Sequence, residues 1–129
     1  DRVPAVAHPM PVEDSDLERS AARYANRLPA ALDIVHLGLG DDGHTASLVP
    51  DDPVLDIVDQ KVALTLPYRG HRRMTLTFPA LNSAGLLVWL VASSGKTEVL
   101  QRLRDADPSI PAGRVAQGHA LLITDGHRA

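Results

Sequence analysis

Hydrophobic residues recur along part of the chain at the three- and four-residue spacing that is typical of an amphipathic helix. The first such face consists of Leu17, Ala21, Tyr24, Ala25 and Leu28. Ser15 and Glu18 stand at the spacing of a capping box, and Pro29 cannot continue a helix. The pattern therefore predicts a helix that begins near Ser15 and ends before Pro29. A second helix is predicted over residues 94–104, which place Val99, Leu100 and Leu103 inward.

Short apolar runs bounded by glycine, proline and polar residues predict strands elsewhere in the chain. The predicted strands are Ile34–Leu37, Val62–Leu66, Met74–Phe78, Leu86–Ala92 and Ala120–Thr124. The run over 34–37 is continuous, so we expect a central parallel strand with His36 as a hydrogen-bonded core residue. Residues 45–49 predict the start of a helix, and residues 79–82 predict a short helix or a turn. Strands that alternate with helices indicate an α/β fold with a mostly parallel sheet.

Composition narrows the class of protein. The chain has 129 residues, of which 44% are hydrophobic and 22% charged, as in a single globular domain with its own core. A net charge of -3 argues against a nucleic-acid partner bound through its phosphates. With 0 cysteines, disulfides and a thiol nucleophile are excluded, which fits a reducing cytoplasm. No apolar run approaches membrane-spanning length, so no membrane partner is expected.

The stretch over residues 33–50 combines glycines, acids and an imidazole directly after a predicted strand. Its polar part contains Gly38, Gly40, Asp41, Asp42, Gly43 and His44. Open α/β sheets bind ligands at the carboxyl ends of their strands, where glycines let a ligand approach the backbone. A carboxylate can orient His44 as a general base, and loop N–H groups could stabilise an oxyanion. The alternative is a solvated turn. A metal site of Asp41, Asp42 and His44 is less favoured because the spacing matches no standard motif.

Two basic segments could bind an anion. Lys96 stands between a predicted strand and a predicted helix, where a phosphate would be favoured. Leu90 occupies the place of the first glycine of a P-loop, so that motif is absent. The second segment, residues 69–73, contains three arginines, and a guanidinium binds phosphate with two hydrogen bonds. The Lys96 segment is equally compatible with a solvated lysine, and an arginine cluster of this kind is more often a solvated loop.

Several of these motifs, taken in order, resemble those of the 6-phosphogluconolactonase family. The similar segments are Leu37–Pro50, Arg73–Thr77, Pro79–Ala84, Gly95-Lys96, Pro111-Ala112 and the closing apolar strand into Asp125. The resemblance implies a three-layer α/β/α fold, shared with glucosamine-6-phosphate deaminases and ribose-5-phosphate isomerases. It also implies hydrolysis of 6-phospho-D-glucono-1,5-lactone to 6-phosphogluconate in the pentose phosphate pathway.

The same resemblance assigns roles to individual residues. His44 would be the general base that activates water, and Asp42 would share the catalytic loop with it. The loop residues Gly40, Asp41 and Gly43 would contact the substrate. Arg73 and Lys96 would hold the 6-phosphate. The reaction needs neither a metal nor an organic cofactor, and the partner is a small sugar phosphate lactone.

Two other functions remain open. In the deaminase branch of the superfamily, Asp-Gly-His is followed by a run with a glutamate, whereas residues 45–50 contain none, which favours the lactonase. A non-catalytic sugar-phosphate sensor on the same scaffold is the second alternative. A monomer or weak oligomer is expected.

The family begins with a strand and a glycine- and Ser/Thr-rich phosphate loop, followed later by another acidic site residue. Residues 1–32 resemble neither. We therefore expect residues 1–129 to be the C-terminal portion of one domain, without part of the phosphate cradle and several strands. These residues alone are not expected to be active.

Overall fold

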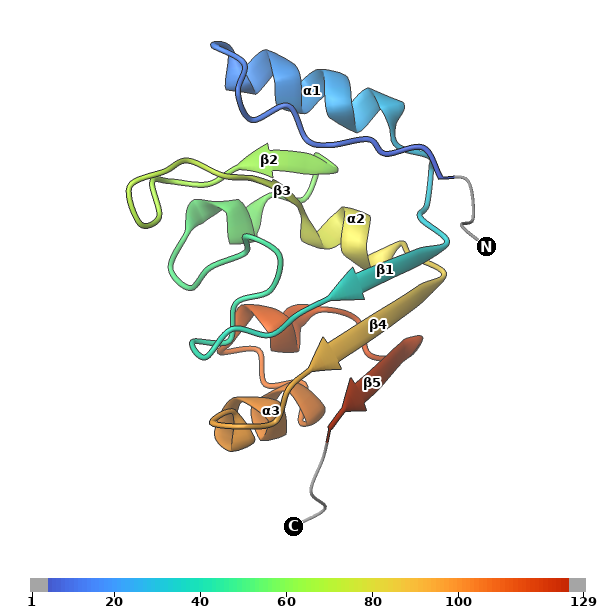
Figure 1. Cartoon of the computed structure of the whole chain (residues 1–129), viewed down its shortest axis with the longest axis vertical. Coiled ribbons are helices and arrows are strands. Elements are labelled where there is room, and N and C mark those ends of the chain that lie inside the picture. The colour runs from blue at the N-terminus through green and yellow to red at the C-terminus, as the bar shows by residue number, and fades with distance from the viewer. Residues whose placement is uncertain (1–4, 126–129) are drawn as a thin grey trace.

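The computed structural model describes residues 5–125 and contains short strands, helices and two 3-10 turns in alternation (Figure 1). In chain order the elements are α1 (Leu17–Arg27), β1 (Ile34–Leu37), η1 (Pro53–Asp56), β2 (Val62–Leu64), β3 (Met74–Leu76), α2 (Phe78–Asn82), β4 (Leu86–Val91), α3 (Thr97–Arg104), η2 (Pro111–Arg114) and β5 (Ala120–Thr124). None of the helices in this part of the chain is both long and apolar enough to cross a membrane.

Three strands form a parallel sheet in the order β1-β4-β5. His36 is paired with Val88, and Trp89 of β4 is paired with Leu37 on one side and Leu122 on the other. The expected parallel sheet with helices is therefore confirmed. The prediction that 34–37 is the central strand was wrong for the described sheet, because the longer β4 lies between its neighbours. Strands β2 and β3 form a separate antiparallel ribbon.

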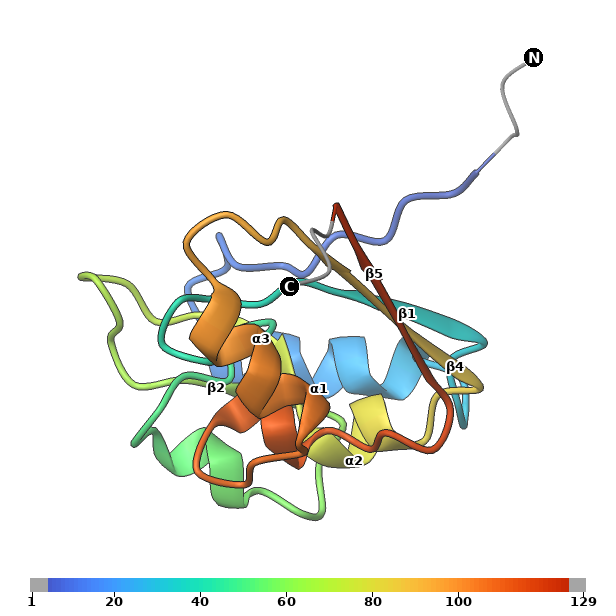
Figure 2. The same ribbon diagram turned by 90° about the horizontal axis from the view of Figure 1, so that it is seen from below.

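One face of the parallel sheet carries the core. Its inward side chains pack against α2, α3 and the loops that connect them, and Figure 2 shows these helices on one side of the sheet. The buried set includes Val35, Leu37, Leu87, Trp89, Val91, Leu81, Leu100, Leu103 and Ile110. A smaller cluster of Ala21, Val62 and Met74 joins α1 to the β2–β3 ribbon. The predicted inward faces of both helices are thus confirmed.

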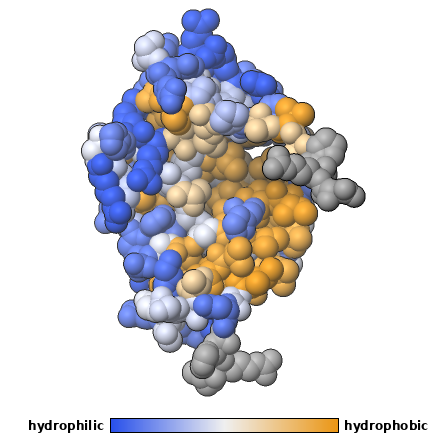
Figure 3. Space-filling view, in the orientation of Figure 1, coloured by the Kyte–Doolittle hydropathy of each residue, from blue (hydrophilic) through white to orange (hydrophobic). Residues whose placement is uncertain are grey.

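The opposite face of the sheet is open in the described structure. Ile34 is 64% exposed and Leu90 is 56% exposed, and Leu121 and Ile123 are exposed beside them. Figure 3 shows the resulting apolar area over β1, β4 and β5. His36 points to this face and is exposed, so its assignment to the core was wrong. The described residues therefore supply the sheet and the layer on one of its faces.

Several predicted boundaries shift for local reasons. The N-cap of α1 is Asp16 rather than Ser15, because the Asp16 carboxylate accepts a hydrogen bond from the Arg19 N–H (3.0 Å). Residues 45–49 do not start a helix. They form a turn closed by a hydrogen bond from the Leu48 N–H to the Thr45 oxygen (2.8 Å). Phe78 opens α2 instead of ending β3, and Thr97 rather than Ser94 opens α3.

Candidate active site

The loop after β1 is held together by its own backbone. The Gly40 N–H donates to the His44 oxygen (2.8 Å), and the Gly43 N–H donates to the Gly40 oxygen (3.0 Å). The Thr45 hydroxyl donates back to the oxygen of Gly38 (2.8 Å), where the strand ends. These bonds fold the loop into a compact unit at the carboxyl end of the parallel sheet. They also occupy the Gly40 and Gly43 N–H groups, which are therefore not free to bind an oxyanion.

Glycine at position 40 is a steric requirement of this unit. A Cβ built on Gly40 would lie 2.1 Å from Nδ1 of His44, a distance that no pair of non-bonded atoms tolerates. The imidazole therefore lies directly against the backbone of Gly40. The loop sequence places the ring by leaving that one position without a side chain.

Asp42 orients the imidazole. Its carboxylate oxygen Oδ1 lies 2.6 Å from Nδ1 of His44 and also accepts the His44 backbone N–H (3.1 Å). Partial burial opposes ionisation of Asp42, but these hydrogen bonds outweigh that effect and hold the pKa of its carboxyl below the usual value. With Nδ1–H donating to an ionised carboxylate, Nε2 keeps the lone pair that a general base needs.

Lys96 reaches the same loop from the neighbouring strand. Because β4 pairs with β1 in parallel, the turn after β4 lies beside the turn after β1. The Lys96 ammonium donates to the oxygen of Leu39 and lies 3.5 Å from Oδ1 of Asp41. An ammonium has three donors, so this arrangement leaves capacity for an anionic ligand. The Asp41 side chain is 86% exposed and balances part of the lysine charge.

The third contribution comes from the β2–β3 hairpin. The ring of Tyr68 lies 6.4 Å from the ring of His44, centre to centre. The guanidinium carbons of Arg69 and Arg73 lie 5.3 Å and 5.0 Å from the centre of the Tyr68 ring. Sequence reasoning noted the arginines but missed Tyr68. The one available signal was a lone aromatic residue next to a basic cluster.

Together these parts surround one cleft of about 640 Å³. Its lining consists of Gly38, Leu39, Gly40, Asp41, Asp42, His44, Ala46, Tyr68, Arg69 and Lys96. Of the seven residues that the resemblance gave a role, five meet in this cleft: Gly40, Asp41, Asp42, His44 and Lys96. The other two do not line the cleft. Arg73 lies against Tyr68, and Gly43 is buried under the loop, where its oxygen accepts the Ala112 N–H (2.9 Å).

No group of three or more histidine and carboxylate side chains suited to a metal ion occurs within residues 5–125. Asp41 and Asp42, which the sequence left as a metal alternative, point to different partners. Asp41 pairs with Lys96, and Asp42 pairs with His44. The cleft is therefore arranged as an acid–imidazole pair facing a cation.

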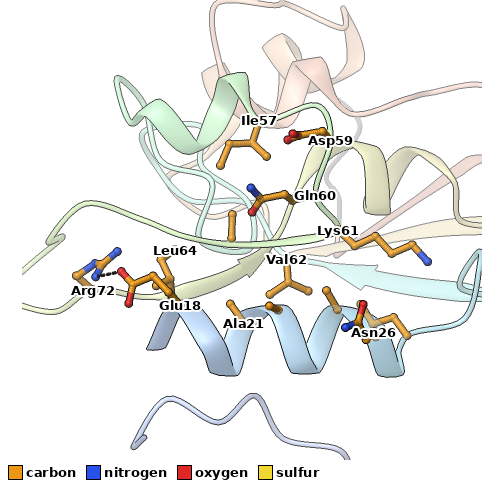
Figure 4. Close-up of a pocket in the computed structure, with 14 residues that line it drawn as sticks. Glu18, Ala21, Asn26, Ile57, Asp59, Gln60, Lys61, Val62, Leu64 and Arg72 are labelled. Carbon is orange, nitrogen blue, oxygen red and sulfur yellow. Dashed lines mark hydrogen bonds and ion pairs between the residues drawn. The ribbon is translucent and has the colours of Figure 1, made fainter. Parts of the chain in front are cut away.

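A second hollow, of about 800 Å³, lies between α1 and β2 (Figure 4). Three of its four charged side chains have partners: Arg72 binds Glu18 at 2.7 Å, and the Lys61 ammonium donates to the oxygen of Pro29 (2.7 Å). The fourth is Asp59. The rest of the lining is mostly alanine and aliphatic side chains. The hollow contains no imidazole, and we assign it no role in the chemistry of the cleft.

Comparison with known proteins identifies a family. Residues 2–124 match the family described as "Glucosamine-6-phosphate isomerases/6-phosphogluconolactonase". A 6-phosphogluconolactonase from Synechocystis sp. is 38% identical over 128 residues, which cover 90% of this chain and 53% of the relative. One from Rattus norvegicus is 37% identical over 117 residues, with 82% and 44% covered.

The fold is similar to that of solved structures. The crystal structure of 6-phosphogluconolactonase from Thermotoga maritima superposes with a TM-score of 0.73 at 27% identity, over 84% of this chain and 51% of that one. The chain spans about half the length of the curated relatives it matches. The match over residues 2–124 shows that the chain belongs to the glucosamine-6-phosphate isomerase/6-phosphogluconolactonase family.

Proposed function

We propose that this protein hydrolyses 6-phospho-D-glucono-1,5-lactone to 6-phospho-D-gluconate, a step of the pentose phosphate pathway. The observation that carries the proposal is the Asp42–His44 pair, whose Nδ1–Oδ1 distance is 2.6 Å and which lines one cleft together with Lys96. The names of the relatives from Synechocystis sp. and Rattus norvegicus support the same reaction.

The chemistry follows from the orientation of His44. Its Nε2 accepts a proton from water while the water oxygen attacks the lactone carbonyl carbon. The bond between that carbon and the ring oxygen then breaks, and the ring oxygen takes the proton back from the imidazolium. The ionised Asp42 stabilises the imidazolium in between.

The phosphate of the substrate is distant from the lactone carbonyl, so the cations that bind it should lie apart from the general base His44. We propose that Lys96 and Arg73 bind it, as ammonium and guanidinium groups commonly do. Gly40 and Asp41 line the cleft and would contact the sugar, and Gly43 would support the loop from beneath. No metal or organic cofactor takes part in this scheme.

Two alternatives share the fold. The family description also names glucosamine-6-phosphate isomerases, which would open a ring rather than cleave an ester. Residues 45–50 carry no carboxylate, and the two acids of the cleft are already paired with His44 and Lys96, which favours the lactonase. A non-catalytic sensor of sugar phosphates would bind its ligand through the cations, and His44 would have no catalytic role.

The test is lactone hydrolysis by the full-length protein, followed through the 6-phosphogluconate formed and corrected for spontaneous opening. We expect His44→Ala to lower kcat by about 10²–10⁴-fold, the usual contribution of a general base, with little change in KM. His8→Ala is the matched control, because this exposed histidine lies in the lead-in segment before α1. Ammonia release from glucosamine 6-phosphate would favour the isomerase branch, and binding of 6-phosphogluconate without turnover would favour the sensor.

We also propose a cytoplasmic monomer or weak oligomer with a small-molecule partner and with neither nucleic acid nor membrane as partner. The cysteine-free composition and the net charge of -3 support these points.

A further inference from the structure

The tip of the β2–β3 hairpin places an arginine in an unusual backbone conformation. Tyr68 and His71 exchange two backbone hydrogen bonds, of 2.9 Å and 3.2 Å, around the two residues between them. Arg69 has φ 51° and Gly70 has φ 85°, as in a type I′ turn. That turn favours asparagine, aspartate or glycine at its first central position, so arginine is not the residue that the turn itself would select.

The Arg69 side chain turns toward the cleft rather than toward a carboxylate. It lines the cleft together with His44 and Lys96, and its guanidinium lies over the ring of Tyr68. Within residues 5–125 neither Arg69 nor Arg73 forms an ion pair with an acid. The nearby Arg72 behaves differently, because it pairs with Glu18 at 2.7 Å and lines the hollow beside α1. The hairpin thus places one arginine at the cleft and another at the hollow beside α1.

The ring of Tyr68 contacts two like charges. Both guanidinium carbons, of Arg69 and Arg73, lie within about 6 Å of its ring centre, the usual range of a cation–π contact. Two guanidinium groups that contact one ring repel each other, and an anion bound near them would reduce that repulsion. A phosphate ester carries about -1.5 to -2 charges at neutral pH and offers three acceptor oxygens.

We propose that Arg69 is a further residue that binds the phosphate of the substrate, and that Tyr68 is a positioning residue that holds Arg69 and Arg73 for this purpose. This inference rests on the proposed lactonase function. It extends the phosphate site from the two cations identified in the sequence to a third, carried by the hairpin tip. The Arg69 side chain would then contribute to selecting phosphorylated over plain sugar lactones.

The test compares Arg69→Asn with Arg72→Asn in the full-length protein. Asparagine tolerates the left-handed conformation of this turn, so Arg69→Asn removes the charge while keeping the backbone. We expect KM for 6-phosphogluconolactone to rise about tenfold, the loss of one charged hydrogen bond, with kcat within a factor of about two. The inhibition constant for inorganic phosphate should rise in parallel, and hydrolysis of unphosphorylated glucono-1,5-lactone should not change. Arg72→Asn should leave all of these constants unchanged.

Tyr68→Leu should raise KM by a smaller factor and leave kcat intact, because both arginines would remain but lose their common support. An unchanged KM in Arg69→Asn, or an equal loss with the unphosphorylated lactone, would overturn the proposal. Should Arg69→Asn fail to fold, Arg69→Gly removes the same charge in a residue that the turn prefers. Should the wild-type protein show no lactonase activity, the proposed function fails, and calorimetric binding of inorganic phosphate to wild type and Arg69→Asn still decides the role of Arg69.

Discussion

The two walls of the cleft are built in different ways. One wall is the loop after β1, in which backbone hydrogen bonds and the contact between Gly40 and the His44 ring leave little freedom. The other wall is the tip of the β2–β3 hairpin, where Tyr68 and Arg69 extend from an exposed two-residue turn. A Cβ at Gly70 of that turn would meet nothing within 4 Å.

This difference in rigidity between the two walls matches two functions, proton transfer and phosphate binding. Proton transfer needs an imidazole held in one place, because a displacement of about 1 Å can cost 10²-fold in rate. Binding of a phosphate tolerates more freedom, since a charge acts over a longer distance and an arginine side chain can adjust. We therefore expect changes in the loop wall to act mainly on kcat and changes in the hairpin wall to act mainly on KM.

Among changes beside the catalytic pair, the largest fall in kcat is expected from Gly40→Ala. The added methyl group would occupy the place of the imidazole and push His44 away from Asp42. We expect kcat to fall by about 10²-fold, with a much smaller change in KM. The measurement is steady-state kinetics with 6-phosphogluconolactone.

The matched change in the other wall is Gly70→Ala. A Cβ at position 70 would lie in open space, so the substitution causes no steric clash. Its cost comes from the left-handed backbone conformation of Gly70, which alanine adopts less readily. The free energy of unfolding should drop by about 1 kcal/mol, and kcat should stay near the wild-type value. If both glycine variants lost kcat equally, the two walls would not differ as described.

Lys96→Ala is expected to have an intermediate effect. The Lys96 ammonium lies on the loop side of the cleft but is proposed to bind the phosphate. The substitution should therefore raise KM more than it lowers kcat. A lost charged hydrogen bond of about 1.5–3 kcal/mol corresponds to about a 10- to 150-fold rise in KM. Lys61→Ala is the control, because the only other lysine of the chain lies beside α1. A large fall in kcat with unchanged KM would move Lys96 from substrate binding to transition-state stabilisation.

The smallest effect concerns acid stability. Hydrogen bonds from His44 lower the pKa of Asp42 in the folded protein, so the ionised carboxylate stabilises the loop wall. That stabilisation is complete above the ordinary value of 3.8 and is lost as the pH falls through the lower folded pKa. The tip of the hairpin, residues 68–71, has no carboxylate of its own. The measurement is the free energy of unfolding of wild type and Asp42→Asn between pH 6 and pH 2. The wild type should be more stable at pH 6, and the difference between the two proteins should shrink as the pH falls. A difference that stays constant over this range would contradict the prediction.

The sequence was most informative where local chemistry decides the structure. The glycine loop, its acids and His44 were recognisable because their spacing follows an apolar strand, and the two longer helices were recognisable from their apolar faces. The sequence-based predictions were wrong where contacts with residues far along the chain decide the position of an element. The strand over 34–37 is as apolar as a central strand, yet its partners place it at the edge of the described sheet. His36 consequently faces outward.

By itself, the order of residues determined that an imidazole, a neighbouring carboxylate and a flexible backbone stand together, because these groups are adjacent in the chain. Only the tertiary structure decided which cations join them. Lys96 arrives through the parallel pairing of β4 with β1, and Tyr68 and Arg69 arrive through a hairpin packed against α1. Contacts between residues 24 or more positions apart depend on how sheets and helices bury their apolar faces, and no local pattern records that outcome.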